Sequence, residues 1–190
     1  MAKSINQHPE RDLTPAVSDR DHWQGHPQAS VVLVEYGDYQ CSYCAAAHFA
    51  IKAVQAKFPK DIKFVFRNFP LSNIHPAALM AAEAAEAAGA QGKFWEMHDL
   101  LYENQARLSE ALIAEAAQQL GLDVHRLLNE INEHKYLPRI REDFNSGSQS
   151  GVNGTPGFFL NGFKYDQPYD VPSLTEALRS LLQENRWLTP

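Results

Sequence analysis

The stretch that decides the fold is Val31-Val-Leu-Val-Glu-Tyr-Gly-Asp-Tyr-Gln-Cys-Ser-Tyr-Cys44, in which an apolar run leads into a Cys-x-x-Cys sequence. The helix-forming residues 45–54 follow at once. This order predicts a strand, a short turn and a helix that begins at the two cysteines. Because a helix N-terminus favours negative charge, the first thiol is expected to ionise readily. The second lies three residues later on the same helix face, within reach of a disulfide.

Cys41 and Cys44 are the only cysteines of the chain. We therefore predict thiol–disulfide exchange in which Cys41 is a nucleophile with a lowered pKa. Cys44 is expected to be buried one turn further in and to resolve the mixed disulfide that forms at Cys41. Two other interpretations remain open for a lone Cys-x-x-Cys, namely a pair of inert core thiols or half of a zinc site.

Composition excludes several classes of function. A length of 190 residues suits one domain or one domain with a large insertion, and 44% of the residues are hydrophobic. The net charge of −6 and the lack of a basic run argue against nucleic acid or an anionic membrane as partner, and no apolar stretch reaches the length of a membrane span. The polar N-terminus lacks a signal-peptide pattern, so a cytoplasmic location is expected, or a periplasmic one if the chain is a processed form.

The remaining sequence predicts an α/β protein. A second strand at residues 62–67, separated from the first by the helix at the cysteines, predicts a βαβ unit with parallel strands. Residues 157–160 and 163–165 are expected to form a hairpin, because Asn161-Gly162 favours a type I′ turn. An amphipathic helix at residues 172–183 closes the chain.

The strands flank a block, residues 76–149, that shows helix signals only. Residues 1–30 are predicted to be a partly tethered arm with a possible edge strand, so that the α/β domain comprises residues 31–75 and 150–190. The expected helices of the block span residues 76–88, with Pro76 at the first helical position, 92–103, 110–120 and 124–133, and a last piece that starts at Pro138 and ends in a flexible segment at 145–151.

Two further residues are candidates for the site. Glu35 lies on the same strand face as Val31 and Leu33, where burial would raise its pKa and make it a proton acceptor for Cys44, although a strand-end glutamate in solvent fits the pattern equally well. Pro156, preceded by Thr155, is a place where a cis peptide bond costs little. A cis bond there would leave the Thr155 backbone free to pair with substrate; from the residues alone, an ordinary loop proline is the simpler interpretation.

Histidine spacing raises a metal hypothesis. His48 extends the cysteines to Cys-x-x-Cys-x-x-x-His, and zinc would need a fourth ligand from His22, His26 or His75. We expect His48 to lie on the helix surface instead, and structural zinc sites usually use more thiolates than this chain has, so no metal is predicted. His75 is expected to serve the entry of the next helix, and Tyr43 to tune the pocket or to pack.

Three motifs in order carry a family resemblance: Glu35-Tyr-Gly-Asp-Tyr-Gln-Cys41-Ser-Tyr-Cys44, a helical insertion, and Gly154-Thr155-Pro156. Together they resemble the DsbA-type branch of the thioredoxin superfamily over residues 12–183. His75-Pro76 and Gly92-Lys-Phe-Trp-Glu-Met97 also resemble segments of the insertion in these proteins.

The resemblance implies a thioredoxin fold, with a central mixed sheet, helices on both sides and an α-helical cap before the last hairpin. It implies that Cys41 is an exposed nucleophile, Cys44 its partner, Glu35 a buried acid beside them and Pro156 a cis proline that faces the disulfide. Thr155 would contact substrate through its backbone. Ser42 and Tyr43, candidate substrate contacts, depart from the Pro-His of strongly oxidising members and offer only hydrogen bonding.

We therefore predict an enzyme, a thiol–disulfide oxidoreductase that acts on protein thiols and disulfides or on glutathione. It would need no cofactor besides its own Cys41–Cys44 disulfide, with glutathione as a candidate co-substrate. Two rival functions are a glutathione-dependent transferase or isomerase of related fold, which would not need Cys44, and a redox-inert or zinc-binding interaction module.

Overall fold

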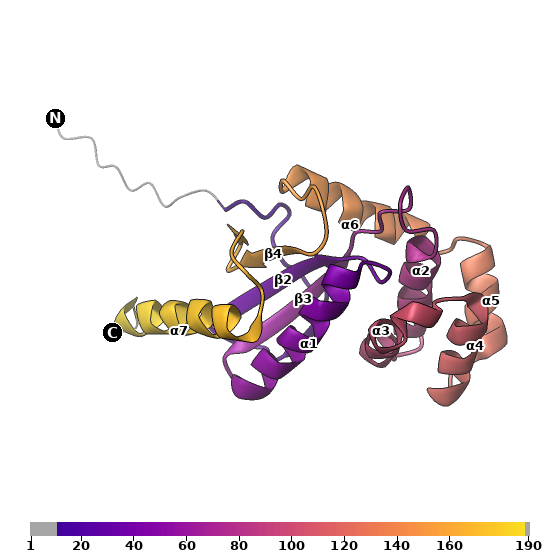
Figure 1. The fold of residues 1–190 in the computed structure, drawn as a ribbon, viewed down its shortest axis with the longest axis horizontal. Coiled ribbons are helices and arrows are strands. Elements are labelled where there is room, and N and C mark those ends of the chain that lie inside the picture. The colour runs from indigo at the N-terminus through magenta and orange to yellow at the C-terminus, as the bar shows by residue number, and fades with distance from the viewer. Residues whose placement is uncertain (1–10, 189–190) are drawn as a thin grey trace.

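A computed structural model describes residues 11–188, with side chains up to residue 184. Its centre is a mixed five-stranded sheet in the order β1-β3-β2-β4-β5, which confirms the predicted fold class (Figure 1). β2 and β3 are parallel, and the other neighbouring pairs are antiparallel. The strands are β1 (His22–Gly25), β2 (Val31–Gly37), β3 (Ile62–Asn68), β4 (Gly157–Leu160) and β5 (Phe163–Tyr165).

The helical insertion is confirmed as well, because the described chain between β3 and β4 contains helices and no strand. α2 begins at Ala78 rather than at Pro76, since Pro76 and Ala77 form the preceding turn. The helices are α1 (Ser42–Lys57), α2 (Ala78–Gly89), α3 (Phe94–Glu103), the 3-10 turn η1 (Gln105–Arg107), α4 (Glu110–Gln119), α5 (Val124–Asn132), α6 (Leu137–Gln149) and α7 (Val171–Leu188).

Alternation along the strands divides the core into two layers. Leu33 and Phe64 lie in the larger cluster, which α1, α2, α3 and α7 cover, whereas Val34 and Val65 lie in the smaller one on the opposite face. Figure 1 shows α1 and α7 on one side of the sheet, α6 on the other, and α2 to α5 grouped beyond one end of it. The cysteines and Glu35 therefore belong to the face that α1 covers.

The segment predicted to be flexible, residues 145–151, is instead the end of α6 and the turn that follows, which corrects the prediction. Its small residues allow α6 to approach the sheet closely. A Cβ atom at Gly147 would lie 2.8 Å from the rings of both Phe69 and Tyr36. The Ser146 hydroxyl contacts the Tyr36 hydroxyl at 2.8 Å. Residues typical of a flexible loop thus serve helix packing here.

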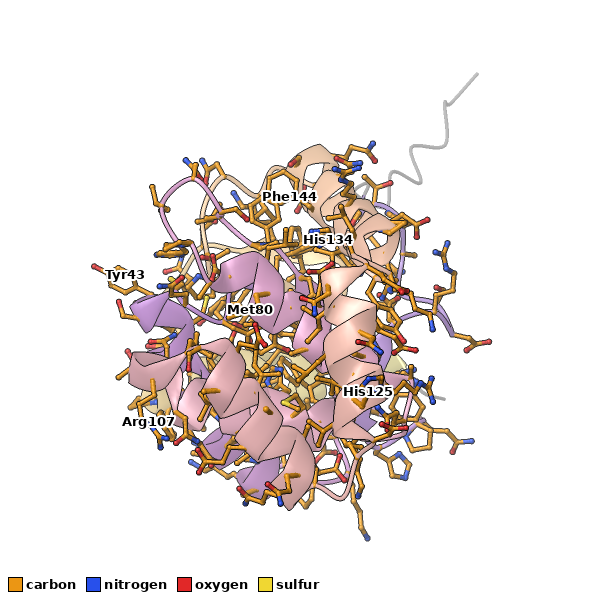
Figure 2. The ribbon with its side chains drawn as sticks, turned by 90° about the vertical axis from the view of Figure 1, so that its right-hand side faces the viewer. Tyr43, Met80, Arg107, His125, His134 and Phe144 are labelled. Atoms are coloured by element: carbon orange, nitrogen blue, oxygen red, sulfur yellow. The ribbon has the colours of Figure 1, made fainter. Side chains whose placement is uncertain are left out.

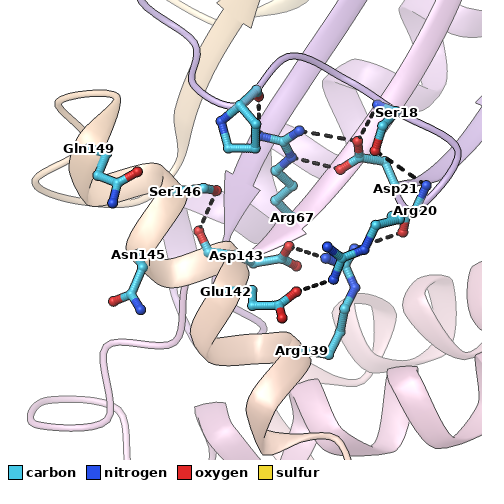
Figure 3. A pocket seen from close by; sticks show the side chains of 11 residues that line it. Ser18, Arg20, Asp21, Arg67, Arg139, Glu142, Asp143, Asn145, Ser146 and Gln149 are labelled. Carbon is cyan, nitrogen blue, oxygen red and sulfur yellow. Dashed lines mark hydrogen bonds and ion pairs between the residues drawn. The ribbon is translucent and has the colours of Figure 1, made fainter.

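The described part of the N-terminal arm is held to the sheet, and β1 is the expected edge strand beside β3. Arg67 of β3 is buried and donates to both carboxylate oxygens of Asp21, at 2.7 and 3.1 Å, and to the Pro15 carbonyl at 3.1 Å. Figure 3 shows this cluster beside α6, where Arg139 is paired with Asp143. Residues 1–10 of the predicted arm lie outside the described part of the chain.

The β4–β5 hairpin turns as predicted. Asn161 and Gly162 both have positive φ, +52° and +89°, as a type I′ turn requires. The Asn161 side chain also accepts a hydrogen bond from the Val32 amide at 2.8 Å, which ties the hairpin to the sheet.

Among the described residues, no helix combines the length and apolar character needed to cross a membrane.

Candidate active site

The two cysteines lie at the start of α1. Cys41 is the N-cap residue, in extended conformation, and Cys44 lies in the first turn. Both are free thiols, and the two side chains are 3.8 Å apart. Cys44 is completely buried, as predicted. Cys41 is only 5% exposed, which corrects the expectation of an exposed nucleophile; the segment around Thr155 lies against it.

Hydrogen bonds to sulfur determine the acidity of Cys41. The largest contribution is the hydrogen bond from Cys44, and smaller ones come from Thr155 and from the backbone N–H groups of Cys44 and Tyr43. They outweigh burial and lower the pKa of Cys41 to about 5. Backbone N–H groups at the start of α1 thus favour the thiolate, as the sequence predicted.

The pKa values of Cys44 and Glu35 are raised, in contrast to that of Cys41. Burial, the hydrogen bond to Cys41 and the charge of Glu35 raise the pKa of Cys44 well above its usual range. Burial, and secondly the charge of Cys41, raise the pKa of Glu35 to about 8. The Glu35 side chain is 1% exposed and its Oε1 atom has no hydrogen-bond partner. Of the two interpretations of Glu35, the structure thus supports the buried acid.

Thr155 and Pro156 come from the segment before β4, and Thr155 contacts Cys41. The Thr155–Pro156 peptide bond is cis, and the Thr155 carbonyl accepts a hydrogen bond from the Cys41 thiol at 3.4 Å. The Thr155 hydroxyl is buried without a partner in the thiol form, so it remains able to donate to the Cys41 thiolate. The structure therefore brings together Cys41, Cys44 and Thr155 of the predicted site, and Pro156 adjoins Thr155 through the cis bond.

Asp38, which the sequence analysis did not select, organises the turn before Cys41. Its carboxylate accepts from the Gln40 amide at 2.7 Å, from the Leu71 amide at 2.8 Å and contacts His75 Nδ1 at 2.8 Å. Its backbone carbonyl accepts from the Cys41 amide at 3.1 Å. An aspartate that bonds the amide two residues on is a known turn signal, so the Asp38–Gln40 part was detectable in the sequence. His75 serves this turn as well as the entry to α2.

Gln105 is a second residue that the sequence analysis missed. Its side-chain amide donates to the backbone carbonyls of Tyr39 and Cys41, at 2.8 and 2.9 Å. Gln105 belongs to η1 in the insertion, so the insertion holds the turn that presents the nucleophile. No sequence pattern connects positions 41 and 105, and only the fold places them together.

Ser42 and Tyr43 are both exposed, and Tyr43 is 67% exposed. Figure 2 shows the Tyr43 side chain projecting away from the molecule at the start of α1. The expectation that Tyr43 packs is therefore wrong; its backbone N–H, rather than its ring, contributes to the acidity of Cys41. Ile74, in the loop that Asp38 holds, is a second exposed apolar side chain at 62%.

In the part of the chain that the structure describes, no histidine completes a zinc site with the cysteines. His22 pairs with Glu86 at 2.9 Å, His75 pairs with Asp38, and His26 follows the end of β1. His48 is 4% exposed, so the expectation that it lies on the helix surface is wrong. Within the described chain, the one group of at least three potential ligands that comes together is His48, His98 and Asp99, without either cysteine.

The site combines two free thiols with a buried acid. An acidic thiol and a weakly acidic one lie within disulfide reach, and a protonatable carboxyl group lies buried nearby. The backbone oxygen of Thr155 lies 3.4 Å from the Cys41 sulfur. Such a site can form a mixed disulfide at Cys41 and an internal disulfide with Cys44.

Comparison with known proteins identifies the family of the chain. The family model described as Thioredoxin matches residues 17–180. Among curated relatives, a protein named Na(+)/H(+) antiporter NhaA 1 from Salinispora arenicola is 41% identical over 174 residues, which cover 92% of this chain and 26% of that protein. A protein of the same name from Mycobacterium sp. (strain KMS) is 40% identical over 170 residues, 88% of this chain and 28% of that protein. The chain thus spans about a quarter of the length of these relatives.

Solved structures give the same fold. BdbD from Bacillus subtilis superposes with a TM-score of 0.79 at 22% identity, over 86% of this chain and 94% of that one. A thioredoxin-like oxidoreductase from Silicibacter pomeroyi superposes with a TM-score of 0.77 at 25% identity, over 87% of this chain and 94% of that one. Alpha-DsbA1 from Wolbachia pipientis superposes with a TM-score of 0.78 at 19% identity, over 88% of this chain and 94% of that one. The chain belongs to the thioredoxin family, and the structures that it resembles are those of DsbA-type thiol–disulfide oxidoreductases.

Proposed function

We propose that the protein is a thiol–disulfide oxidoreductase in which Cys41 is the nucleophile and Cys44 the resolving thiol. The observation that carries this proposal is the contrast between two thiols held 3.8 Å apart. The pKa of Cys41 is about 5 and that of Cys44 lies well above its usual range, so at neutral pH only one sulfur is ionised. Exchange through a mixed disulfide needs this division of roles.

In the reducing direction, the Cys41 thiolate attacks one sulfur of a substrate disulfide. An S–S bond forms between Cys41 and substrate, and the second substrate sulfur leaves as a thiolate. Cys44 then loses its proton and attacks Cys41 Sγ, so that the internal disulfide forms and the first substrate sulfur leaves. Two electrons pass from the protein to the substrate. In the oxidising direction a substrate thiolate attacks Cys41 of the internal disulfide, and the same steps run backwards.

Glu35 is the proposed proton acceptor for Cys44. The charge of the Cys41 thiolate contributes to the raised pKa of Glu35, about 8. When Cys41 enters a mixed disulfide this charge disappears, so the pKa of Glu35 falls and more of it is carboxylate. The base therefore becomes available at the step at which Cys44 must be deprotonated.

The lowered pKa of Cys41 favours the oxidising direction. Stabilising the thiolate stabilises the reduced protein, which makes the disulfide a stronger oxidant. Ser42 and Tyr43 replace the Pro-His of strong oxidants in the resembling family, but the acidity here comes from Cys44, Thr155 and backbone N–H groups instead. We propose a reduction potential above the roughly −270 mV of thioredoxin.

Protein thiols and disulfides are the proposed substrates. Tyr43 and Ile74 are 67% and 62% exposed beside the turn that carries Cys41, so a protein that docks at Cys41 could bury both side chains. Glutathione stays a candidate co-substrate and the cytoplasm a predicted location. The antiporter name of the relatives is not carried over, because the match includes only 26% of the first of those proteins.

Two cysteine variants test the proposal. Cys41→Ser should abolish disulfide exchange with a model protein substrate, because no nucleophile remains. Cys44→Ser should accumulate a mixed disulfide at Cys41, visible by mass spectrometry, because nothing resolves it. Exchange retained by Cys41→Ser would refute the assignment. Glutathione transferase or isomerase activity that survives Cys44→Ser would favour that rival function instead.

The reduction potential is measured by equilibrating the protein in glutathione buffers and alkylating free thiols. A value between about −270 and −120 mV is expected and would identify a donor of disulfides. A value at or below about −270 mV would contradict the proposed direction and identify a reductant.

A further inference from the structure

A buried polar cluster that the proposed redox steps do not use lies where α1 packs against α3. One ring nitrogen of His48, one of His98 and one carboxylate oxygen of Asp99 all lie within 4.8 Å of one another. His48 Nε2 is 3.9 Å from Asp99 Oδ1. His48 and His98 are 4% and 2% exposed, whereas the Asp99 side chain is 27% exposed. The three ligating groups thus form a buried triangle with one corner at the surface.

One atom of this triangle is unsatisfied. His48 Nε2 is buried and has no hydrogen-bond partner. A buried polar atom without a partner is destabilising and rare in folded proteins, so its presence calls for a ligand or a function. Asp99 Oδ1 lies too far from His48 Nε2 for a hydrogen bond, and a cation between the two atoms would give the histidine nitrogen a partner.

The ring of His98 is already oriented for ligation. Its Nδ1 contacts the Tyr39 hydroxyl at 3.0 Å, which leaves Nε2 as the nitrogen for a ligand. Histidines that bind metals usually use their other ring nitrogen in this way, because the outer hydrogen bond fixes the ring. The rings of Phe66 and Trp95 pack edge-on against His98 at 4.7 and 5.1 Å and hold it in place.

We propose that His48, His98 and Asp99 form a binding site for one divalent transition-metal ion of the zinc type. Two imidazoles and one carboxylate are a donor set that zinc accepts, with water in the fourth position. The site lies outside the Cys41–Cys44 pair, and its ligands contain no sulfur. It is therefore distinct from a zinc site built on the cysteines.

Lys52 is the group that a metal ion must displace. It lies one turn after His48 on α1 and forms an ion pair with Asp99 in the structure. The Lys52 side chain is 44% exposed, so it can move into solvent when a cation takes its place. Lys52 is thus a competitor for the same carboxylate, and removing it should strengthen metal binding.

The test is a zinc titration of the full chain in its disulfide form, followed by calorimetry. Oxidised cysteines cannot ligate, so a binding stoichiometry of one must come from other residues. Co²⁺ should give a d–d spectrum without a thiolate charge-transfer band. Mg²⁺ and Ca²⁺, which prefer sites made only of oxygen ligands, should bind at least tenfold more weakly. No stoichiometric zinc binding by the oxidised protein would overturn the proposal.

Variants assign the ligands. His48→Gln and Asp99→Asn should each weaken zinc binding more than about tenfold, since losing outer partners alone costs about 10–100-fold. Lys52→Met should tighten binding, a result that a purely structural role of the cluster would not produce. His125→Gln is the matched control, because His125 is exposed on α5 (Figure 2). Equal affinity in all four variants would show surface binding and refute the site.

Discussion

Two buried polar clusters lie on opposite faces of the same sheet and begin at adjacent residues of β2. Glu35 faces α1 and the cysteines, whereas Tyr36 faces α6 and contacts Arg67 at 2.8 Å. Arg67 also has Asp21 and two backbone carbonyls as partners. On the cysteine side, Oε1 of Glu35 and the Tyr102 hydroxyl have no partner.

The two clusters differ in what burial does: on one face it stabilises the fold, and on the other it shifts pKa values. Arg67 and Asp21 satisfy each other, so they hold the N-terminal segment in place and leave no group free to react. The groups around Cys44 are buried without complete pairing, which costs stability but shifts their pKa values toward useful ranges.

The largest effect is expected from breaking the paired cluster. Arg67→Met leaves the Asp21 carboxylate buried without its partner and should lower the free energy of unfolding by about 3–5 kcal/mol, measured with urea. The pKa of Cys41 should not change. Arg107→Met, which removes an exposed ion pair with Glu115, is the control and should cost less than about 1 kcal/mol. Equal losses in both variants would contradict the structural role.

Glu35 should make stability depend on pH in the opposite sense to most carboxylates. Its pKa is about 8 in the folded protein, against 4.5 for an unburied glutamate. Between these values the folded state binds more protons than the unfolded chain, so the free energy of unfolding falls as pH rises. The full shift corresponds to about 5 kcal/mol, and we expect roughly half of it.

This prediction is tested in the disulfide form, where Cys41 has no charge and only burial acts on Glu35. Wild type should lose stability relative to Glu35→Gln between pH 5 and pH 9. A constant difference between the two proteins across this range would show that Glu35 is not held protonated.

Gly147→Ala tests the close packing of α6 on the sheet. The added methyl group would meet the rings of Phe69 and Tyr36 at 2.8 Å, so a loss of about 1–3 kcal/mol in unfolding free energy is expected. Gly154→Ala is the control, because a Cβ atom there meets nothing within 4 Å. A neutral result at Gly147 would indicate that α6 can shift away without cost.

The smallest effect concerns one hydrogen bond to the nucleophile. Thr155→Val removes the hydroxyl that is able to donate to the Cys41 thiolate and should raise the pKa of Cys41 by about one unit, or about 1.4 kcal/mol. The pH dependence of alkylation by iodoacetamide measures this value. Thr175→Val, which removes another buried unpaired hydroxyl, is the control and should leave the pKa of Cys41 unchanged. A shift in both variants would point to general loosening.

The local parts of the site were predictable. The strand before Cys41, the helix after it and the turn at Asn161-Gly162 depend on residues close in sequence, where periodicity and turn chemistry act directly. Errors arose where tertiary packing overrode local preference. The glycine and serines of α6 suggested a flexible segment, but their small size is what close packing against Tyr36 requires.

The sequence alone determined the βαβ order and the position of a reactive Cys-x-x-Cys at a helix start, because these features are set by neighbouring residues. Only the tertiary structure decided which distant groups surround them. Cys41 meets Thr155 across 114 positions, Gln105 meets Cys41 across 64 and Arg67 meets Asp21 across 46. Burial and charge act through space, so the pKa values of Cys41, Cys44 and Glu35 depart from their usual values only once the chain has folded.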